Sequence, residues 1–300
     1  MEGFGLCQTF GPISLLSNRS FHRPDIDGLR ALAILGVLAF HAFPQAVPGG
    51  FVGVDVFFVI SGYVVTLSLL GRAAAHERNS VTGFYGRRVR RLFPALLCVF
   101  LATACAGYFL LSTPQLALLG KHILGSAGFA QNLVLWGESG YFDAASHEKW
   151  LLHLWSLGIE EQFYLLLPLL LLLPRPTGRH REKWVIAGLV LAALASFAFS
   201  LWQSREAPSA GFYWPLGRFW EFFLGVGLAG WHARHKARPH DQTALRMDRR
   251  RLFPALAEEV CALAALLALC LGFVLLTERP WQGWHFPGPL ALWPALTPSH

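Results

Sequence analysis

A cation and an imidazole stand eleven residues apart in the first apolar stretch of the chain, at Arg30 and His41. Eleven residues make about three turns of an α-helix, which predicts both side chains on one helix face, roughly 16 Å apart along the axis. Only apolar residues and Gly36 lie between them, as in a membrane interior. Ionisable groups at such depth are costly and usually functional. The alternative is an anchoring arginine with a histidine at the far interface, and the pair alone does not decide between the two.

A second group of polar residues follows helical spacing between positions 150 and 164. His153, Ser156, Glu160 and Tyr164 are spaced i, i+3, i+7 and i+11, which places them in one stripe of a membrane helix. Two adjacent carboxylates, Glu160 and Glu161, are too costly to face lipid. We therefore expect at least Glu160 to face a pore or cavity.

Asp55 lies in a glycine-rich apolar stretch that runs from Gly49 to Tyr63 and includes Ser61. The acid is expected either to pair with a polar group of a neighbouring helix or to orient His41. Close helix packing explains the glycines equally well, because small residues are common at membrane helix interfaces.

The loop at 71–91 ends in a cluster of arginines that could bind phosphate. Arg87 and Arg91 are spaced i, i+4, and Arg88 and Arg91 are spaced i, i+3, so each pair shares a helix face. Arginine forks match phosphate geometry, although a plain topology signal needs only the positive charge. Both interpretations remain open from the motif alone.

Two further polar groups have a structural interpretation. Trp214, Arg218 and Glu221 form a stripe that is expected to hold an internal ion pair. Three histidines between positions 232 and 240 could suggest zinc, but they lie in a basic loop without other ligands, so no metal site is predicted. The histidines are His232, His235 and His240.

The composition indicates the kind of scaffold that carries these residues. The chain is 54% apolar with a mean hydropathy of +0.43, and its apolar residues come in long runs. The five cysteines show no CxxC pattern, so neither a disulfide framework nor a thiolate metal site is indicated. We predict an all-α, polytopic transmembrane bundle. Its spans are expected at residues 29–45, 51–70, 92–112, 151–173, 184–203, 212–231 and 255–276.

The positive charge is distributed as a topology signal rather than as a nucleic-acid surface. Basic residues cluster in loops 71–91, 174–183 and 232–251, which the positive-inside rule places in the cytoplasm together with the N-terminus. On this assignment span 92–112 leaves the cytoplasm and span 151–173 returns to it. The apolar stretch 116–136 between them therefore cannot also cross the membrane. We predict a re-entrant or interfacial helix there, with residues 138–150 outside the cytoplasm.

The sequence thus combines a cytoplasmic arginine cluster, a histidine within a span and polar residues between them. This combination fits two classes of function. One is an enzyme that uses a phosphate-bearing cytosolic donor on an acceptor across the membrane. The other is a proton-coupled transporter of an anionic solute. Composition does not choose between them.

Taken together, these residues resemble the membrane acyltransferase-3 family, the O-acetyltransferases of bacterial surface polysaccharides. The similarity covers about residues 21–295, and it rests on several motifs in the family's order. These motifs are Phe21 to Ala31, the Arg30–His41 spacing, Gly49 to Tyr63, Arg87 to Pro94, and Leu151 to Tyr164.

The resemblance implies acetyl-CoA as the donor, bound from the cytoplasm, and a hydroxyl of an extracytoplasmic glycan, such as lipopolysaccharide O-antigen, as the acceptor. It implies a multi-pass protein of the bacterial inner membrane with lipid, acetyl-CoA and the glycan as partners, and neither nucleic acid nor metal. His41 would be the general base or a transient acyl carrier, with Glu160 as a second catalytic residue. The CoA phosphates would be held by Arg30, Arg87, Arg88 and Arg91. The acceptor side or acyl tunnel would be lined by Asp55, Ser61, His153, Ser156 and Tyr164.

The sequence departs from the family pattern at both ends. Residues 1–20 are expected to be a tail, and residues 21–300 an acyltransferase-3 transmembrane domain that is incomplete at its C-terminus. Family members usually continue through further helices, so we expect this chain to have little transferase activity by itself. A shortened protein could cover the exposed bundle surface by forming a homo-oligomer.

Overall fold

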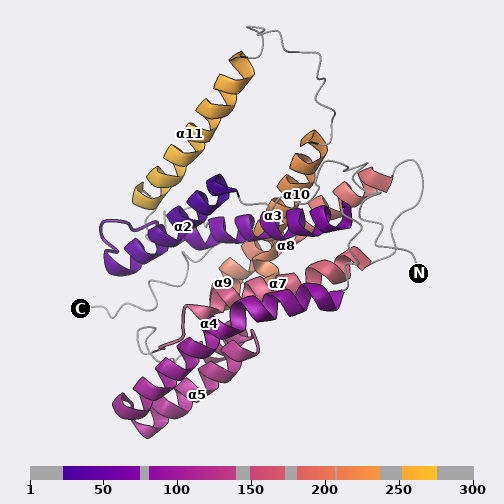
Figure 1. The fold of residues 1–300 in the computed structure, drawn as a ribbon. Helices are drawn as coiled ribbons and strands as arrows, with labels where there is room; N and C mark the ends of the chain where they lie inside the picture. The colour runs from indigo at the N-terminus through magenta and orange to yellow at the C-terminus, as the bar shows by residue number, and fades with distance from the viewer. Residues whose placement is uncertain are drawn as a thin grey trace.

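The computed structural model describes residues 23–74, 81–139, 149–172, 181–206, 208–236 and 252–275. This described part is helical and contains no strand, which confirms the predicted all-α class (Figure 1). Its helices are α2 (Pro24–Ala42), α3 (Val52–Ala74), α4 (Val81–Leu110), α5 (Thr113–Ala127), α6 (Gln131–Glu138), α7 (Leu154–Leu172), α8 (Arg181–Glu206), α9 (Pro208–Tyr213), the 3₁₀ turn η2 (Pro215–Gly217), α10 (Phe219–Lys236) and α11 (Leu252–Leu275).

Each of the seven predicted spans coincides with a long helix, but the boundaries differ. The first span was expected at 29–45, whereas α2 begins at Pro24 and ends at Ala42. Proline is favoured in the first helical turn, and two aspartates of that turn complement the helix dipole. The helix stops early because Phe43 precedes Pro44, and a residue before proline disfavours helical dihedral angles.

Helix α3 lies between α2 and α10 and packs against both through glycines. A methyl group added at Gly53 would overlap the carbonyl of Ala33 on α2, and one added at Gly62 would overlap the carbonyl of Phe222 on α10. Gly225 on α10 fits in the same way against the carbonyl of Val59. The small residues therefore let three helix backbones approach closely, as the packing interpretation of this segment predicted.

Stacked aromatic rings join α7 to the α3–α10 pair. Phe222 of α10 stacks on Phe58 of α3, with ring centroids 4.7 Å apart, and on Phe163 of α7, with centroids 4.5 Å apart. All three rings are fully buried. This core fixes α7 beside α3, which is the arrangement that positions the polar stripe.

The long helices alternate in direction, so the bundle has two ends. Helix α2 ends and α3 begins at one end, called here the turn end, which contains residues 41–55. At the other end, called here the basic end, Arg23 donates a hydrogen bond to the Tyr63 hydroxyl at 2.8 Å and His232 contacts the Tyr63 ring. Helix α11 stands to one side of the bundle in Figure 1, and the Gly49 amide donates to the carbonyl of its Phe273 at 2.9 Å.

Helices α5 and α6 form a hairpin in the segment for which a re-entrant or interfacial helix was predicted. Helix α5 ends in a Schellman motif, in which Ala130 donates to the Gly125 carbonyl at 2.8 Å and Phe129 donates to the Ser126 carbonyl at 3.1 Å. Phe129 has a φ of 53°, a left-handed conformation that usually favours glycine. Its carbonyl accepts a hydrogen bond from Gln162 of α7 at 2.8 Å, which anchors the hairpin turn on the bundle.

Three helices of the described part are long and apolar enough to cross a membrane, at Val52–Gly71, Gly83–Leu110 and Lys183–Glu206. The apolar side chains of the last of these are largely exposed in the bundle, as Leu191 is at 69%. A helix that is apolar and uncovered requires an apolar solvent, and a lipid bilayer is such a solvent. The chain is thus an integral membrane protein.

Candidate active site

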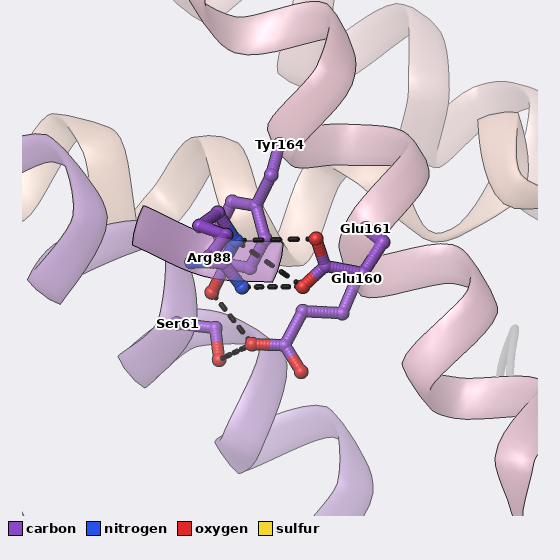
Figure 2. Close-up of polar contacts among 5 residues, drawn as sticks. All are labelled: Ser61, Arg88, Glu160, Glu161 and Tyr164. Atoms are coloured by element: carbon purple, nitrogen blue, oxygen red, sulfur yellow. Dashed lines mark hydrogen bonds and ion pairs between the residues drawn. The ribbon is translucent and has the colours of Figure 1, made fainter. Parts of the chain in front are cut away.

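A buried carboxylate lies where α3 and α7 meet. The Glu160 side chain accepts two hydrogen bonds on the same oxygen, from the Ser61 hydroxyl at 2.7 Å and from the Tyr164 hydroxyl at 2.6 Å (Figure 2). All three residues are buried. Glu160 was expected to face a pore or cavity, and the structure shows it buried in the bundle with Ser61 and Tyr164 as its hydrogen-bond donors.

Arg88 of α4 continues this network toward the basic end. Its guanidinium carbon lies 3.6 Å from the centroid of the Tyr164 ring, and the guanidinium forms an ion pair with Glu161 (Figure 2). A guanidinium stacked on an aromatic face and paired with a carboxylate is held in one orientation. Arg88 thus already has a carboxylate partner in the protein, which any phosphate would have to displace.

The other predicted phosphate-binding arginines occupy different surroundings. Arg87 and Arg91 lie on α4 with exposed side chains. Arg30 of α2 is half-buried, and its guanidinium lies 5.7 Å from the ring centroid of Phe57. The structure therefore places three of the four arginines on one helix and Arg30 on another, beside α3.

His41 lies in the last turn of α2 with its side chain exposed. Its Nδ1 lies 2.8 Å from the carbonyl oxygen of Val37. A carbonyl oxygen only accepts hydrogen bonds, so Nδ1 carries the hydrogen, and Nε2 of a neutral ring keeps a free lone pair. The sequence interpretation placed this imidazole deep inside a span or at its far interface, and the structure places His41 at the end of α2, where the Phe43–Pro44 step stops the helix.

The polar stripe on α7 is divided between two environments. Glu160 and Tyr164 are buried, whereas His153 is exposed and precedes the helix. The charge of His41 acts on His153 as a secondary electrostatic influence, after the partial burial of the His153 ring. The Ser156 hydroxyl donates to the carbonyl of His153 at 3.2 Å. The structure therefore separates His153 from the buried Glu160 and Tyr164, and leaves Ser156 bonded within its own segment.

Asp55 pairs with a polar side chain from another segment, Arg218, which immediately precedes α10, as the pairing interpretation predicted. Its carboxylate accepts a hydrogen bond from Nη1 of Arg218 at 2.9 Å. The same nitrogen lies 3.4 Å from Glu221, which confirms the predicted internal ion pair. Trp214, the third member of that stripe, instead packs on Trp136, with centroids 4.8 Å apart.

Sequence reasoning missed a charged cluster that closes the α5–α6 hairpin. Glu138 lies 2.7 Å from Lys121, 2.9 Å from His122 and 3.6 Å from Lys149. Burial raises the pKa of Glu138, but the hydrogen bonds from Lys121 and His122 outweigh it and hold that pKa below its usual range. The sequence did contain a signal for this cluster. Lys121 and Glu138 have opposite charges and lie in or next to one apolar stretch, where charged side chains favour internal pairing.

A second polar contact that sequence reasoning missed also docks the hairpin. The Gln162 amide donates to Asn132 Oδ1 at 2.9 Å, and Asn132 donates to the Tyr213 carbonyl at 3.0 Å. Gly158 leaves room for this contact, because an added methyl group would lie 2.9 Å from Asn132 Oδ1.

The described residues contain no cluster of three or more histidine, cysteine, aspartate or glutamate side chains that could hold a metal ion. His232 packs against the Tyr63 ring, the side chain of His235 is not described, and His240 lies outside the described residues.

Comparison with known proteins identifies the family of this chain and favours the enzyme class over the transporter class. Residues 23–297, nearly the whole chain, match the family defined by the acyltransferase domain. The chain belongs to the acyltransferase-3 family. This confirms the resemblance of the motifs, and it makes membrane acyl transfer the activity of the class to which the site belongs. No solved structure matches the chain.

Individual relatives carry names that agree with this family. The chain is 37% identical over 220 residues to a putative membrane-bound transacylase, BcsY, of Komagataeibacter xylinus, which covers 71% of this chain and 53% of that protein. It is 35% identical over 180 residues to the O-acetyltransferase OatA of Staphylococcus aureus, covering 59% of this chain and 29% of that protein. A putative O-acetyltransferase of S. aureus is 29% identical over 263 residues, covering 87% and 42%. The chain spans about half or less of the length of these relatives.

Proposed function

We propose that this protein transfers an acetyl group from cytosolic acetyl-CoA to a hydroxyl group of an extracytoplasmic glycan, such as lipopolysaccharide O-antigen or another surface polysaccharide. Membership of the acyltransferase family and the similarity to O-acetyltransferases support acetyl transfer. The protein is assigned to the bacterial inner membrane with its N-terminus in the cytoplasm, because the basic loops follow the positive-inside rule.

The hydrogen bond from His41 Nδ1 to the Val37 carbonyl is the observation that carries this proposal. It leaves Nε2 as a proton acceptor at an exposed position of the turn end. In the proposed reaction, Nε2 takes the proton of the acceptor hydroxyl while the hydroxyl oxygen attacks the thioester carbonyl of acetyl-CoA. The carbon–sulfur bond then breaks, CoA leaves as the thiolate, and the proton on Nε2 returns to the sulfur.

Four arginines are assigned to the phosphates of CoA. Arg87 and Arg91 present their side chains at the basic end, and Arg30 on α2 is on the same helix face as His41, roughly 16 Å away. Arg88 is the fourth, and it would exchange Glu161 for a phosphate when the donor binds. Both partners are anions, so the guanidinium keeps a charged hydrogen-bond acceptor throughout.

Glu160 lies between the arginines and the turn end, and we assign it to the acyl path. With Ser61 and Tyr164 it forms a polar contact between α3 and α7 within the bundle core. His153 and Asp55 are assigned to the acceptor side, because both lie at the turn end. Ser156 is assigned there as well, since it follows His153 by one helical turn.

Membranes that contain the protein provide the test. They are incubated with acetyl-CoA labelled in the acetyl group, and the surface glycan is then isolated and treated with mild alkali to release ester-linked acetate. Label that enters the glycan and is released by alkali supports the proposal. Membranes without the protein are the control. Uptake of an anionic solute that does not depend on acetyl-CoA, with no label in the glycan, would instead support a transporter.

A further inference from the structure

Arg218 is a buried arginine of the described bundle core, and only one of its three guanidinium nitrogens has hydrogen-bond partners among the described residues. The residue is 1% exposed, and its Nη1 contacts both Asp55 and Glu221. Among the described residues, Nε and Nη2 have no hydrogen-bond partner although both atoms are buried. These two nitrogens form the edge with which arginine binds a pair of oxygen atoms.

Unpartnered buried donors are uncommon in folded proteins, because each one loses its hydrogen bonds to water without replacement. The neighbouring Glu221 carboxyl, whose Oε1 lies 3.4 Å from Nη1, has a second oxygen, Oε2, that is also buried and without a partner among the described residues. The site therefore offers two N–H donors next to a carboxyl oxygen. A sugar hydroxyl satisfies such a pair, because it accepts from the guanidinium and either donates to the carboxylate or accepts from the carboxylic acid.

Charge indicates that the occupant is neutral. The ion pair with Asp55 already balances the single positive charge of Arg218. An anionic ligand would leave excess negative charge in a site of low dielectric, which is unfavourable. A hydroxyl-bearing ligand adds no charge and uses the same hydrogen bonds.

Aromatic rings supply the apolar part of the site. The guanidinium carbon of Arg218 lies 5.5 Å from the ring centroid of Phe212 and 5.8 Å from that of Trp155, and these two rings are 4.5 Å apart. Aromatic faces beside hydrogen-bonding groups suit a pyranose, which has apolar C–H faces and a rim of hydroxyl groups. Asp55 is 26% exposed, so it marks the side from which a ligand enters.

We propose that Arg218, Glu221, Phe212 and Trp155 form a subsite for a neutral hexose residue of the acceptor glycan. This inference rests on the proposed function for the identity of the acceptor. The subsite lies at the start of α10, beside Asp55 near the turn end, which is the end that also holds His41. It would hold the glycan by a residue that is not itself acetylated.

The variant Arg218→Lys separates this role from that of the ion pair. Lysine keeps a positive charge for Asp55 but lacks the Nε–Nη2 edge. Binding of methyl α-D-glucopyranoside, methyl α-D-galactopyranoside, methyl α-D-glucuronide and inorganic phosphate to the purified protein in nanodiscs is measured by saturation-transfer NMR, without acetyl-CoA. Arg205→Lys, at the exposed end of α8, is the matched control.

We expect one of the neutral glycosides to bind the wild type and Arg205→Lys alike, and to bind Arg218→Lys at least about 10-fold more weakly, the loss typical of hydrogen bonds to a charged group. The acceptor KM should rise by a similar factor while the KM for acetyl-CoA stays constant. Equal binding by Arg218→Lys, or preference for glucuronide or phosphate, overturns the proposal. If Arg218→Lys does not fold, Phe212→Leu is used in its place. Its binding of the neutral glycosides is compared with that of the wild type and of Arg205→Lys, and weaker binding is again expected.

The binding and transfer experiments separate the two proposals. Glycoside binding that depends on Arg218, in a protein that acetylates no glycan, would keep the subsite and refute the proposed function. Acetylation of a glycan without any loss of acceptor affinity in Arg218→Lys would keep the function and refute the subsite.

Discussion

The two hydroxyl groups that donate to Glu160 should stabilise the protein cooperatively. Tyr164→Phe removes a 2.6 Å hydrogen bond and keeps the aromatic ring beneath Arg88, while Ser61→Ala removes a 2.7 Å hydrogen bond. Hydrogen bonds to charged groups contribute about 1.5–3 kcal/mol, so each single variant should lower the free energy of unfolding by that amount.

The double variant should lose more than the sum of the two single losses. Both donors serve the same oxygen, Oε1 of Glu160, so either one alone still partners it. Removal of both leaves a buried carboxylate oxygen without either donor, and coupling between groups in one network is about 0.5–3 kcal/mol. The expected total loss is therefore about 3.5–9 kcal/mol, combining the two single terms and the coupling.

Equilibrium unfolding of the purified protein in mixed micelles, followed by tryptophan fluorescence, gives the free energies for the cycle. Ser156→Ala is the matched control, because among the described residues its hydroxyl donates to the nearby His153 carbonyl alone, and it should change stability by less than about 0.5 kcal/mol. A Tyr164→Phe loss below that value, or a double loss equal to the sum of the singles, would refute the shared-oxygen account.

Three further predictions concern donor binding, topology and pH. Arg87→Lys and Arg91→Lys keep the positive charge that sets the topology but lose the guanidinium fork. Each should therefore raise the KM for acetyl-CoA about 10-fold while the membrane orientation stays unchanged. An unchanged KM in both variants would mean that these arginines only anchor the topology. Pro114→Cys and Ser139→Cys should react with an impermeant thiol reagent from the same, extracytoplasmic side, since α5 and α6 form a hairpin, and labelling from opposite sides would contradict this topology. The pKa of Glu138 is lowered in the folded protein, so its stabilisation is present above the unfolded pKa of about 4.3 and is lost as the pH falls through the folded pKa. Glu138→Gln should therefore lower the Tm at pH 7 and have progressively less effect below about pH 4, whereas a Tm difference that stays constant with pH would exclude the linkage.

Long apolar runs predicted the helices well, because a membrane span requires about twenty apolar residues whatever its neighbours are. Helix ends were predicted less well, since they depend on local chemistry such as the Phe43–Pro44 step that stops α2. The same step places His41 in the last turn of the helix rather than within it. The hairpin at α5–α6 was predictable because the charge pattern left no other way to alternate the spans.

Pairings across the bundle were the part that sequence could not supply. The sequence identified Glu160 as interior, but its Ser61 donor is 99 residues away, and Arg88 is 73 residues from Glu161. Asp55 and Arg218 are 163 residues apart, and several cations were equally available as partners. Helical spacing defines which residues share a face, whereas the choice of the facing helix depends on glycine contacts and ring packing in three dimensions.

Replacement of His41 by alanine tests directly whether this residue is the general base. His41→Ala is compared with the wild type and with Leu38→Ala, an exposed position of the same helix, in the labelled acetyl-CoA assay at equal protein levels. Loss of a general base lowers the rate by about 10²–10⁴-fold, so His41→Ala should lose transfer by that factor while Leu38→Ala retains it. Acetylation of the glycan by His41→Ala at near the wild-type rate would contradict the account.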